Sequence, residues 1–174
     1  MKAEDVAAAL GDLGRTSVKE GVVRLEVDVG RLREAARRVA ELGFDHVASL
    51  TVVDRVKEGR FELIYVAESY DNPGVLVEIV TRVPRSEPRV PSLVDIWPGV
   101  AWQERENWEM FGVEFEGHEG LHRHLLLPPD WPDNVHPLRK DFVVKEEPIM
   151  APPELQKRAE EIAKARMGGQ QGKA

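Results

Sequence analysis

Three consecutive strand-like segments joined by short turns constrain the fold of this 174-residue chain more than any other feature. The segments are residues 46–53, 61–68 and 75–82, and the last two are separated by Asp71-Asn72-Pro73-Gly74, a sequence typical of tight turns. Short turns favour antiparallel neighbours, because a parallel pair needs a long crossover connection. We therefore expect an antiparallel sheet at the centre of the molecule.

The residues before these segments switch between helix and strand patterns. Residues 3–13 are rich in alanine and leucine, which is typical of a short amphipathic helix. Residues 22–29 alternate apolar and polar side chains, as a strand with one face in water does. Residues 31–42 carry apolar side chains at helical spacing, and Gly43 is a natural helix end. The order predicts an α+β two-layer sandwich, with a mainly antiparallel sheet and helices on one face.

Composition excludes several kinds of site and partner. The chain has no cysteine, so its own sulfur cannot form a disulfide, a cysteine-type zinc site or an iron–sulfur cluster. The 31 acidic residues exceed the 24 lysines and arginines, and the net charge of −7 argues against nucleic acid as a partner. Its apolar runs are far shorter than the ~20 residues that cross a bilayer, and Glu4 and Asp5 interrupt any signal peptide. We expect a cytoplasmic protein with its amino terminus intact.

The sequence changes character after the proline-rich residues 84–91. Ser92 is placed to cap a short turn, and a helix is expected over residues 99–111, ended by Gly112. Residues 113–142 are dense in proline, glycine, histidine and tryptophan without a sustained period. All four tryptophans lie within residues 97–131, which argues against disorder and for an interface.

We therefore expect residues 113–142 to lie extended on another polypeptide rather than on their own domain. The expected organisation is an α+β domain over residues 1–90, followed by a signature helix and an extended partner-wrapping arm over residues 91–150. A C-terminal helix within residues 152–167 and a flexible tail would complete residues 151–174.

One short motif suggests metal chemistry. His118-Glu119-Gly120-Leu121-His122 matches the H-E-x-x-H pattern, in which two histidines on one helix face bind zinc and the glutamate acts as general base. Gly117 and Gly120 disfavour that helix, and Pro128 stands where a third histidine ligand would be needed. A zinc hydrolase is therefore a remote alternative, and coincidence is the better interpretation.

The charged residues of the expected helix allow two interpretations. Glu104, Glu106 and Glu109 surround Arg105, and they could form solvent-facing charge pairs or a buried ionic network at an interface. The chain has no glycine-rich phosphate loop and no G-x-S-x-G nucleophile motif. We expect no catalytic centre in this chain alone.

The sequence E-R-E-N-W-E-M-F-G-V-E-F-E-G-H at residues 104–118 resembles a family signature, that of the 30 kDa subunit (the C subunit) of respiratory complex I. The same family includes the matching subunits of membrane-bound nickel–iron hydrogenases. The resemblance continues through the leucine-rich residues 125–127 and ends in H-P-L-R-K-D-F at residues 136–142. This chain departs from the family pattern at Glu109, where aspartate is usual, at Glu119, where proline is usual, and at His122, where arginine is common.

The resemblance implies a structural subunit with no catalytic residue, no cofactor and no metal site. Such a protein would lie on the cytoplasmic peripheral arm, contact D-like (hydrogenase-large-type) and B-like subunits of the same complex, and reach the membrane only through the complex. It would support electron transfer coupled to ion translocation, in an NADH:quinone enzyme or alternatively in a membrane-bound hydrogenase or ferredoxin-linked sulfur reductase. The implied partner-binding residues are Trp97, Glu104, Arg105, Glu106, Trp108, Phe111, Gly112, Phe115, Gly117, His118, Arg123, Trp131, Pro137, Leu138, Arg139, Lys140 and Asp141.

Overall fold

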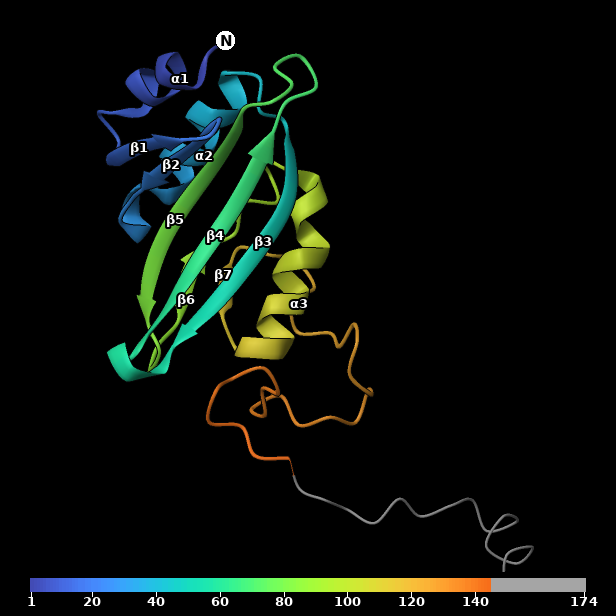
Figure 1. Cartoon of the computed structure of the whole chain (residues 1–174). Coiled ribbons are helices and arrows are strands. Elements are labelled where there is room, and N and C mark those ends of the chain that lie inside the picture. Colours follow the sequence, from blue (N-terminus) through green and yellow to red (C-terminus); the bar gives the residue numbers. More distant parts are fainter. Residues whose placement is uncertain (145–174) are drawn as a thin grey trace, which may run out of the picture. The chain divides into compact units, whose positions relative to one another are not determined.

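The computed structural model describes residues 1–144, and the helix expected within residues 152–167 lies outside them. Residues 1–142 form one compact unit (Figure 1). In chain order its elements are α1 (Ala3–Leu10), β1 (Arg15–Lys19), β2 (Val22–Glu26), η1 (Val29–Arg31), α2 (Leu32–Glu41), β3 (His46–Arg55), η2 (Val56–Glu58), β4 (Arg60–Glu68), β5 (Leu76–Pro84), β6 (Arg89–Pro91), η3 (Pro98–Val100), α3 (Ala101–Phe111) and β7 (Glu114–Glu116).

The main sheet has five strands in the order β1-β2-β5-β4-β3. Only β2 and β5 run parallel, with Val23 opposite Val77, so the expected α+β fold with a mainly antiparallel sheet is confirmed. The β1–β2 hairpin turns through Glu20 and Gly21, whose φ angles of 52° and 82° suit a two-residue turn with both central residues in the left-handed region. A second, two-stranded parallel sheet joins β6 to β7.

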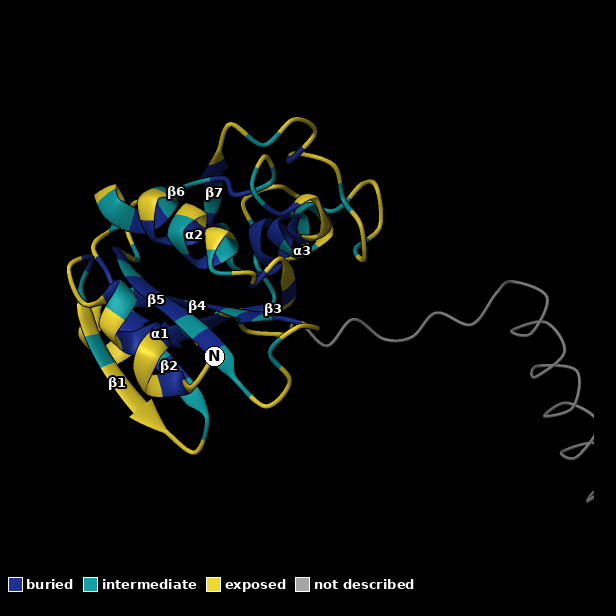
Figure 2. Cartoon of the chain, turned by 90° about the horizontal axis from the view of Figure 1, so that it is seen from above, coloured by how far each residue is buried: buried dark blue, intermediate teal, exposed yellow. Residues whose placement is uncertain are grey.

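The three α-helices lie on one face of the main sheet (Figure 2). Helix α2 buries Leu32, Ala35, Ala36 and Val39 toward β5, as the helical spacing of its apolar side chains predicts. Helix α1 packs beside β1 and β2, and α3 packs against β3. None of the helices within residues 1–144 combines the length and the apolar character needed to span a bilayer.

The opposite face of the sheet carries a network of ion pairs between neighbouring strands. Glu62, which is only 5% exposed, accepts a hydrogen bond of 2.8 Å from Nε of Arg82, and Arg24 donates to Glu78 at 2.9 Å. Burial tends to raise the pKa of Glu62, but the hydrogen bond and charge of Arg82 lower it below the ordinary value. These charges satisfy one another, so the face is suited to contact with water.

The second half of the chain packs on the first. Residues 113–142 were instead expected to lie on another polypeptide rather than on their own domain. Trp97, Trp108 and Phe115 are buried in the chain's own core rather than on a neighbouring polypeptide. The indole Nε1 of Trp97 donates to the carbonyl oxygen of Phe44 at 3.1 Å. Residues 121–142, which we call the strap, also return to this unit: the backbone N–H of Leu138 donates to the carbonyl of Met110 at 3.1 Å.

Candidate functional site

Helix α3 is the element around which the second half of the chain is organised. It ends at Gly112, as the sequence predicts, because Gly112 has φ 73° and its N–H donates to the carbonyl of Trp108 at 2.7 Å. A Cβ atom at Gly112 would lie 2.3 Å from Nε2 of His136, so this position has no room for a side chain. Glycine is thus needed here both for its conformation and for the close approach of the strap.

Glu104 of α3 fixes the chain that enters the helix. Its carboxylate, 0% exposed, accepts hydrogen bonds from Oγ of Ser92 at 2.6 Å and from the N–H of Leu93 at 2.9 Å. The predicted turn at Ser92 is present, since Ser92 Oγ accepts from the N–H of Val94. Burial raises the pKa of Glu104 above the ordinary value, although both hydrogen bonds oppose this.

The phenol of Tyr65 lies buried near this carboxylate without a hydrogen-bond partner. Burial, together with the charge of Glu104, raises the pKa of Tyr65 well above its ordinary value. Both groups are enclosed in the core, so they do not present a reactive pair to a substrate.

The carboxylate of Glu109 accepts hydrogen bonds from three consecutive backbone N–H groups of the strap. The N–H groups of Leu125, Leu126 and Leu127 donate to its carboxylate at 3.1, 3.0 and 2.8 Å. Nδ1 of His124 lies 3.1 Å from the same carboxylate. Burial tends to raise the pKa of Glu109, but the backbone hydrogen bonds together lower it below the ordinary value. A charged carboxylate therefore holds this part of the strap on the helix.

Arg105 holds the residues just before this turn. Its Nη2 donates to the carbonyl oxygen of Arg123 at 2.8 Å, and its guanidinium lies 5.1 Å from the centre of the Trp102 ring. Nε2 of His124 lies 2.9 Å from the carbonyl oxygen of Trp131, which connects the turn to the next bend of the strap. Both open interpretations of the helix charges are thus replaced by a third: Glu104, Arg105 and Glu109 bind backbone groups of their own chain.

The end of the strap is anchored on the edge of the main sheet. Arg139 donates through Nε to the carbonyl of Phe111 at 2.6 Å and lies 5.4 Å from the centre of the Phe61 ring. The N–H of Lys140 donates to Oδ2 of Asp54 at 2.8 Å, and Arg85 forms ion pairs with both Asp54 and Asp141. The side chains of Arg139 and Asp141 and the backbone N–H of Lys140 therefore bind groups of this same chain.

The implied partner-binding residues fall into two groups. Some are engaged internally through their side chains or, for Lys140, its backbone N–H: Trp97, Glu104, Arg105, Trp108, Phe111, Phe115, His118, Arg139, Lys140 and Asp141. Others remain exposed to contact, namely Glu106, Arg123 and Leu138, while Trp131 and Pro137 are half-buried. Gly112 and Gly117 both adopt positive φ.

Sequence reasoning missed two charged side chains that hold the end of the strap. Asp54 and Arg85 lie in the first half of the chain, far in sequence from Lys140 and Asp141. Their only signal was that Asp54 continues the alternation of Leu50 and Val52 one position past the expected strand over residues 46–53, and a buried carboxylate there needs a partner. Glu109 was recognised as a family position but not as the centre of a hydrogen-bonding cluster.

The H-E-x-x-H motif does not form a zinc site of the metalloprotease kind. Gly117 and Gly120 have φ angles of 90° and 81°, so residues 117–121 are not helical. Nε2 of His118 lies 2.9 Å from the carbonyl oxygen of Ala101, whereas Nε2 of His122 lies 3.1 Å from the Glu114 carboxylate. Within residues 1–144, no three histidine, aspartate or glutamate side chains are placed to share a metal ion. The zinc hydrolase hypothesis fails on this geometry.

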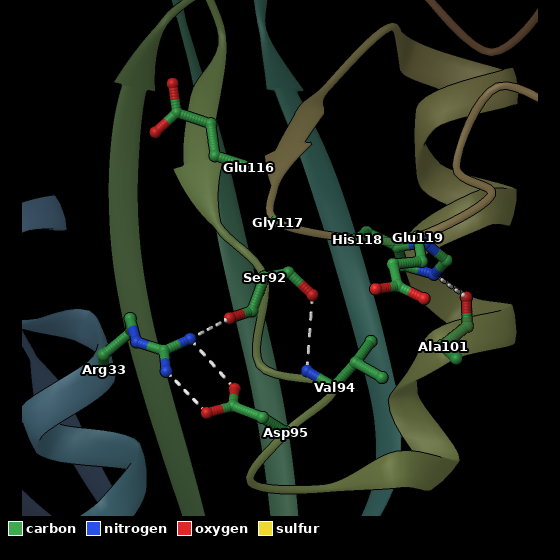
Figure 3. A pocket seen from close by; sticks show the side chains of 9 residues that line it. All are labelled: Arg33, Ser92, Val94, Asp95, Ala101, Glu116, Gly117, His118 and Glu119. Atoms are coloured by element: carbon green, nitrogen blue, oxygen red, sulfur yellow. Dashed lines mark hydrogen bonds and ion pairs between the residues drawn. The ribbon is translucent and has the colours of Figure 1, made fainter.

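A groove of about 410 Å³ lies between α2 and the residues around β7 (Figure 3). Arg33 forms one wall, where it donates to Asp95 at 2.6 Å and to the carbonyl of Ser92. The Ser92 hydroxyl donates to the Glu104 carboxylate, but both side chains are buried, so this pair is not presented to a substrate. The groove is lined by both polar and apolar groups, and its side chains form no catalytic arrangement.

A family model for the 30 kDa subunit of respiratory-chain NADH dehydrogenase matches residues 25–148. The C subunit of the NADH-quinone oxidoreductase of Acidothermus cellulolyticus is 38% identical over 135 residues, which cover 74% of this chain and 67% of the relative. The C/D subunit of the NADH-quinone oxidoreductase of Gluconacetobacter diazotrophicus is 37% identical over 129 residues, 70% of this chain and 20% of that longer protein.

A solved structure agrees in fold. A chain of the membrane-bound sulfane sulfur reductase, an archaeal respiratory membrane complex, superposes with a TM-score of 0.73 and 29% identity. The similarity covers 89% of each chain. The fold described above thus recurs in a chain of this archaeal respiratory complex.

Proposed function

This chain belongs to the family of the 30 kDa subunit of respiratory-chain NADH dehydrogenase, and from that premise we propose that it is a non-catalytic, cofactor-free docking subunit. Its parent is a membrane-bound oxidoreductase of the complex I type or a related respiratory complex. In this role the chain carries no electrons. It holds other subunits in the positions that electron transfer requires.

The observation that carries this proposal is the way in which the strap presents apolar side chains. The charges of α3 bind the strap's backbone, while Leu126 is 61% exposed and Leu138 is 53% exposed. Trp102, on the outer side of α3, is 60% exposed. Large apolar side chains exposed on an ordered surface are typical of protein–protein interfaces. A partner polypeptide is thus a better match to this surface than a substrate.

The proposed main partner is the D-like, hydrogenase-large-type subunit of the same complex. The relative in which C and D are one protein supports this choice, because fusion keeps two regions of one polypeptide permanently close. A B-like protein is the second proposed neighbour. The proposed location is the cytoplasmic side of the membrane, with attachment only through the complex.

The alternative parent complex is a related respiratory enzyme rather than an NADH:quinone oxidoreductase. A chain of the sulfane sulfur reductase shares the fold over 89% of this chain, with 29% identity. This favours keeping a sulfur-reductase or hydrogenase-type complex as the second candidate. The identity of the large subunit that binds this chain distinguishes the two.

Isolation of the complex from its own membranes tests the proposed function. The full chain, carrying an affinity tag and expressed in its native host, is purified in mild detergent and the bound proteins are identified by mass spectrometry. We expect a hydrogenase-large-type subunit in equal molar amount, and no flavin, metal or cluster in the separately purified chain. A chain that purifies alone from membranes, or that carries a stoichiometric cofactor, contradicts the proposal.

A further inference from the structure

The leucine turn of the strap, residues 124–127, has a defined structure although it belongs to no helix or strand. Three successive N–H groups of this turn point at one carboxylate, that of Glu109. Backbone donors that leave water need such an acceptor, because an unpaired buried N–H is unfavourable. Two prolines follow directly, at residues 128 and 129, and they restrict the chain further. The turn is therefore built around Glu109.

We propose that Glu109 is a positioning residue that shapes the leucine turn into a docking surface before any partner binds. The surface consists of the exposed side chains of Leu125, Leu126 and Leu138, and the occupant it fits is an apolar patch on the hydrogenase-large-type subunit. The choice of occupant rests on the proposed function. The internal ordering of the turn does not.

The charge of Glu109 is what makes it suitable for this task. Hydrogen bonds from N–H groups to an ionised carboxylate are about twice as strong as those between neutral groups. The lowered pKa of Glu109, to which the three N–H groups contribute, agrees with an ionised carboxylate at neutral pH. A glutamine at this position would offer one acceptor oxygen, and its NH₂ group would face the N–H donors of the turn.

Neighbouring contacts hold the turn from both sides. On one side, Arg105 binds the carbonyl oxygen of Arg123. On the other, His124 spans from Glu109 to the carbonyl oxygen of Trp131. The backbone N–H of Leu138 donates to the carbonyl of Met110, the residue next to Glu109. Both leucine-bearing parts of the strap are thus fixed at the C-terminal end of α3.

A preformed turn changes how the protein binds its partner. A segment that orders only on its partner loses conformational entropy at that moment, which weakens the complex. A turn already held by Glu109 has lost that entropy in the free protein. Disrupting the turn therefore weakens docking without removing any side chain that touches the partner.

Hydrogen–deuterium exchange of the full-length chain, combined with binding to the purified large subunit, tests this inference. In the wild type we expect the amides of residues 125–127 to exchange at least tenfold more slowly than in the Glu109→Gln variant. Glu109→Asp keeps the charge and should retain part of the protection. Glu41→Gln makes the same chemical change at an exposed position of α2, outside the strap and the implied partner-binding residues, so it serves as the matched control and should behave as the wild type.

Binding measurements distinguish the contribution of the turn's conformation from that of its exposed side chains. Glu109→Gln is expected to bind the large subunit at least tenfold more weakly, with protection of residues 125–127 recovered in the complex. Leu126→Ser should bind at least tenfold more weakly while keeping the protection in the free chain. Circular dichroism and tryptophan fluorescence check that each variant is folded.

Two results would overturn the inference: equal exchange at residues 125–127 in the wild type and Glu109→Gln, or unchanged binding of a folded Glu109→Gln variant. A wild-type chain that does not bind the large subunit refutes the proposed function instead. In that case the exchange comparison still decides whether Glu109 orders the turn.

Discussion

Glu104 and Glu109 are both buried on α3, yet the pKa values of their carboxyl groups are shifted in opposite directions. Desolvation dominates at Glu104, which receives two hydrogen bonds, and raises its pKa. At Glu109 burial also acts, but three backbone N–H groups and His124 outweigh it and lower the pKa. The balance between desolvation, which is stronger at Glu104, and hydrogen-bond donors, which are more numerous at Glu109, therefore decides the direction of each pKa shift.

These opposite shifts predict opposite dependences of stability on pH. The raised pKa of Glu104 means that its contribution to the free energy of unfolding is full below the ordinary glutamate pKa of about 4.3 and is lost as the pH rises through the folded-state value. The lowered pKa of Glu109 means that its contribution is present above about pH 4.3 and is lost as the pH falls through the folded-state value.

Urea unfolding followed by tryptophan fluorescence, at several pH values from about 3 to about 7, measures both contributions. Wild type minus Glu104→Gln should give a difference in unfolding free energy that decreases with rising pH. Wild type minus Glu109→Gln should give a difference that increases with rising pH. Slopes of the same sign for the two pairs would show that the environments of the two carboxylates are not as described.

Gly112 provides a second prediction at this scale. Gly112→Ala forces a Cβ into the left-handed region, at roughly 1–2 kcal/mol, and against His136. We expect the variant to be less stable by at least that amount in urea unfolding. Gly99→Ala is the matched control, since Gly99 has open space around its Cβ position, and should change stability by less than about 0.5 kcal/mol. Equal effects of the two substitutions would refute the close packing at Gly112.

At the scale of elements, α3 also closes the edge of the main sheet at β3. Nδ2 of Asn107 donates to the carbonyl oxygens of Leu50, at 3.1 Å, and Gln103, at 2.8 Å. Nε2 of Gln103 donates to the carbonyl of Val47 in the same strand. Edge strands with free backbone groups invite pairing with other chains, so these amides protect the sheet as well as fixing the helix on it.

Removal of one amide should therefore be costly. Asn107→Ala leaves the carbonyl of Leu50 without this donor, and we expect a loss of about 1–3 kcal/mol in the free energy of unfolding. The measurement is chemical denaturation, with light scattering to detect association through the uncovered edge. Glu106→Ala, an exposed change on the same helix, should alter stability by no more than about 0.5 kcal/mol. An Asn107→Ala variant as stable as this control would contradict the role of the amide.

The elements differ in how far they could be predicted from the sequence. Helix α2 and strands β3 to β5 carry regular apolar patterns, so periodicity identified them. Strand β1 has little burial and therefore no pattern to detect. The strap was identified as an ordered, interface-forming segment, but its contacts with α3 were not expected. Its backbone is held by Glu109, Arg105 and Asp54 through hydrogen bonds, which leave no apolar period in the sequence.

At the scale of the whole molecule, residues 1–142 are one compact unit in which the second half is folded on the first. The strap, with its exposed apolar side chains, lies near the end of the sheet where β4 begins, and the loop between β4 and β5 lies at the other end (Figure 1). Docking through the strap would leave that loop, with its exposed Tyr70, free of the large subunit. The end that carries the strap is thus suited to contact with a partner. Position 70, at the other end, can serve as a control position in a crosslinking experiment.

Site-specific photo-crosslinking in native membranes tests docking through the strap most directly. A photoreactive amino acid is placed at position 126 in one variant and at position 70 in another, and the adducts are identified by mass spectrometry. We predict that position 126 crosslinks to the hydrogenase-large-type subunit and that position 70 does not. A crosslink to that protein from position 70 with none from position 126 would contradict docking through the strap.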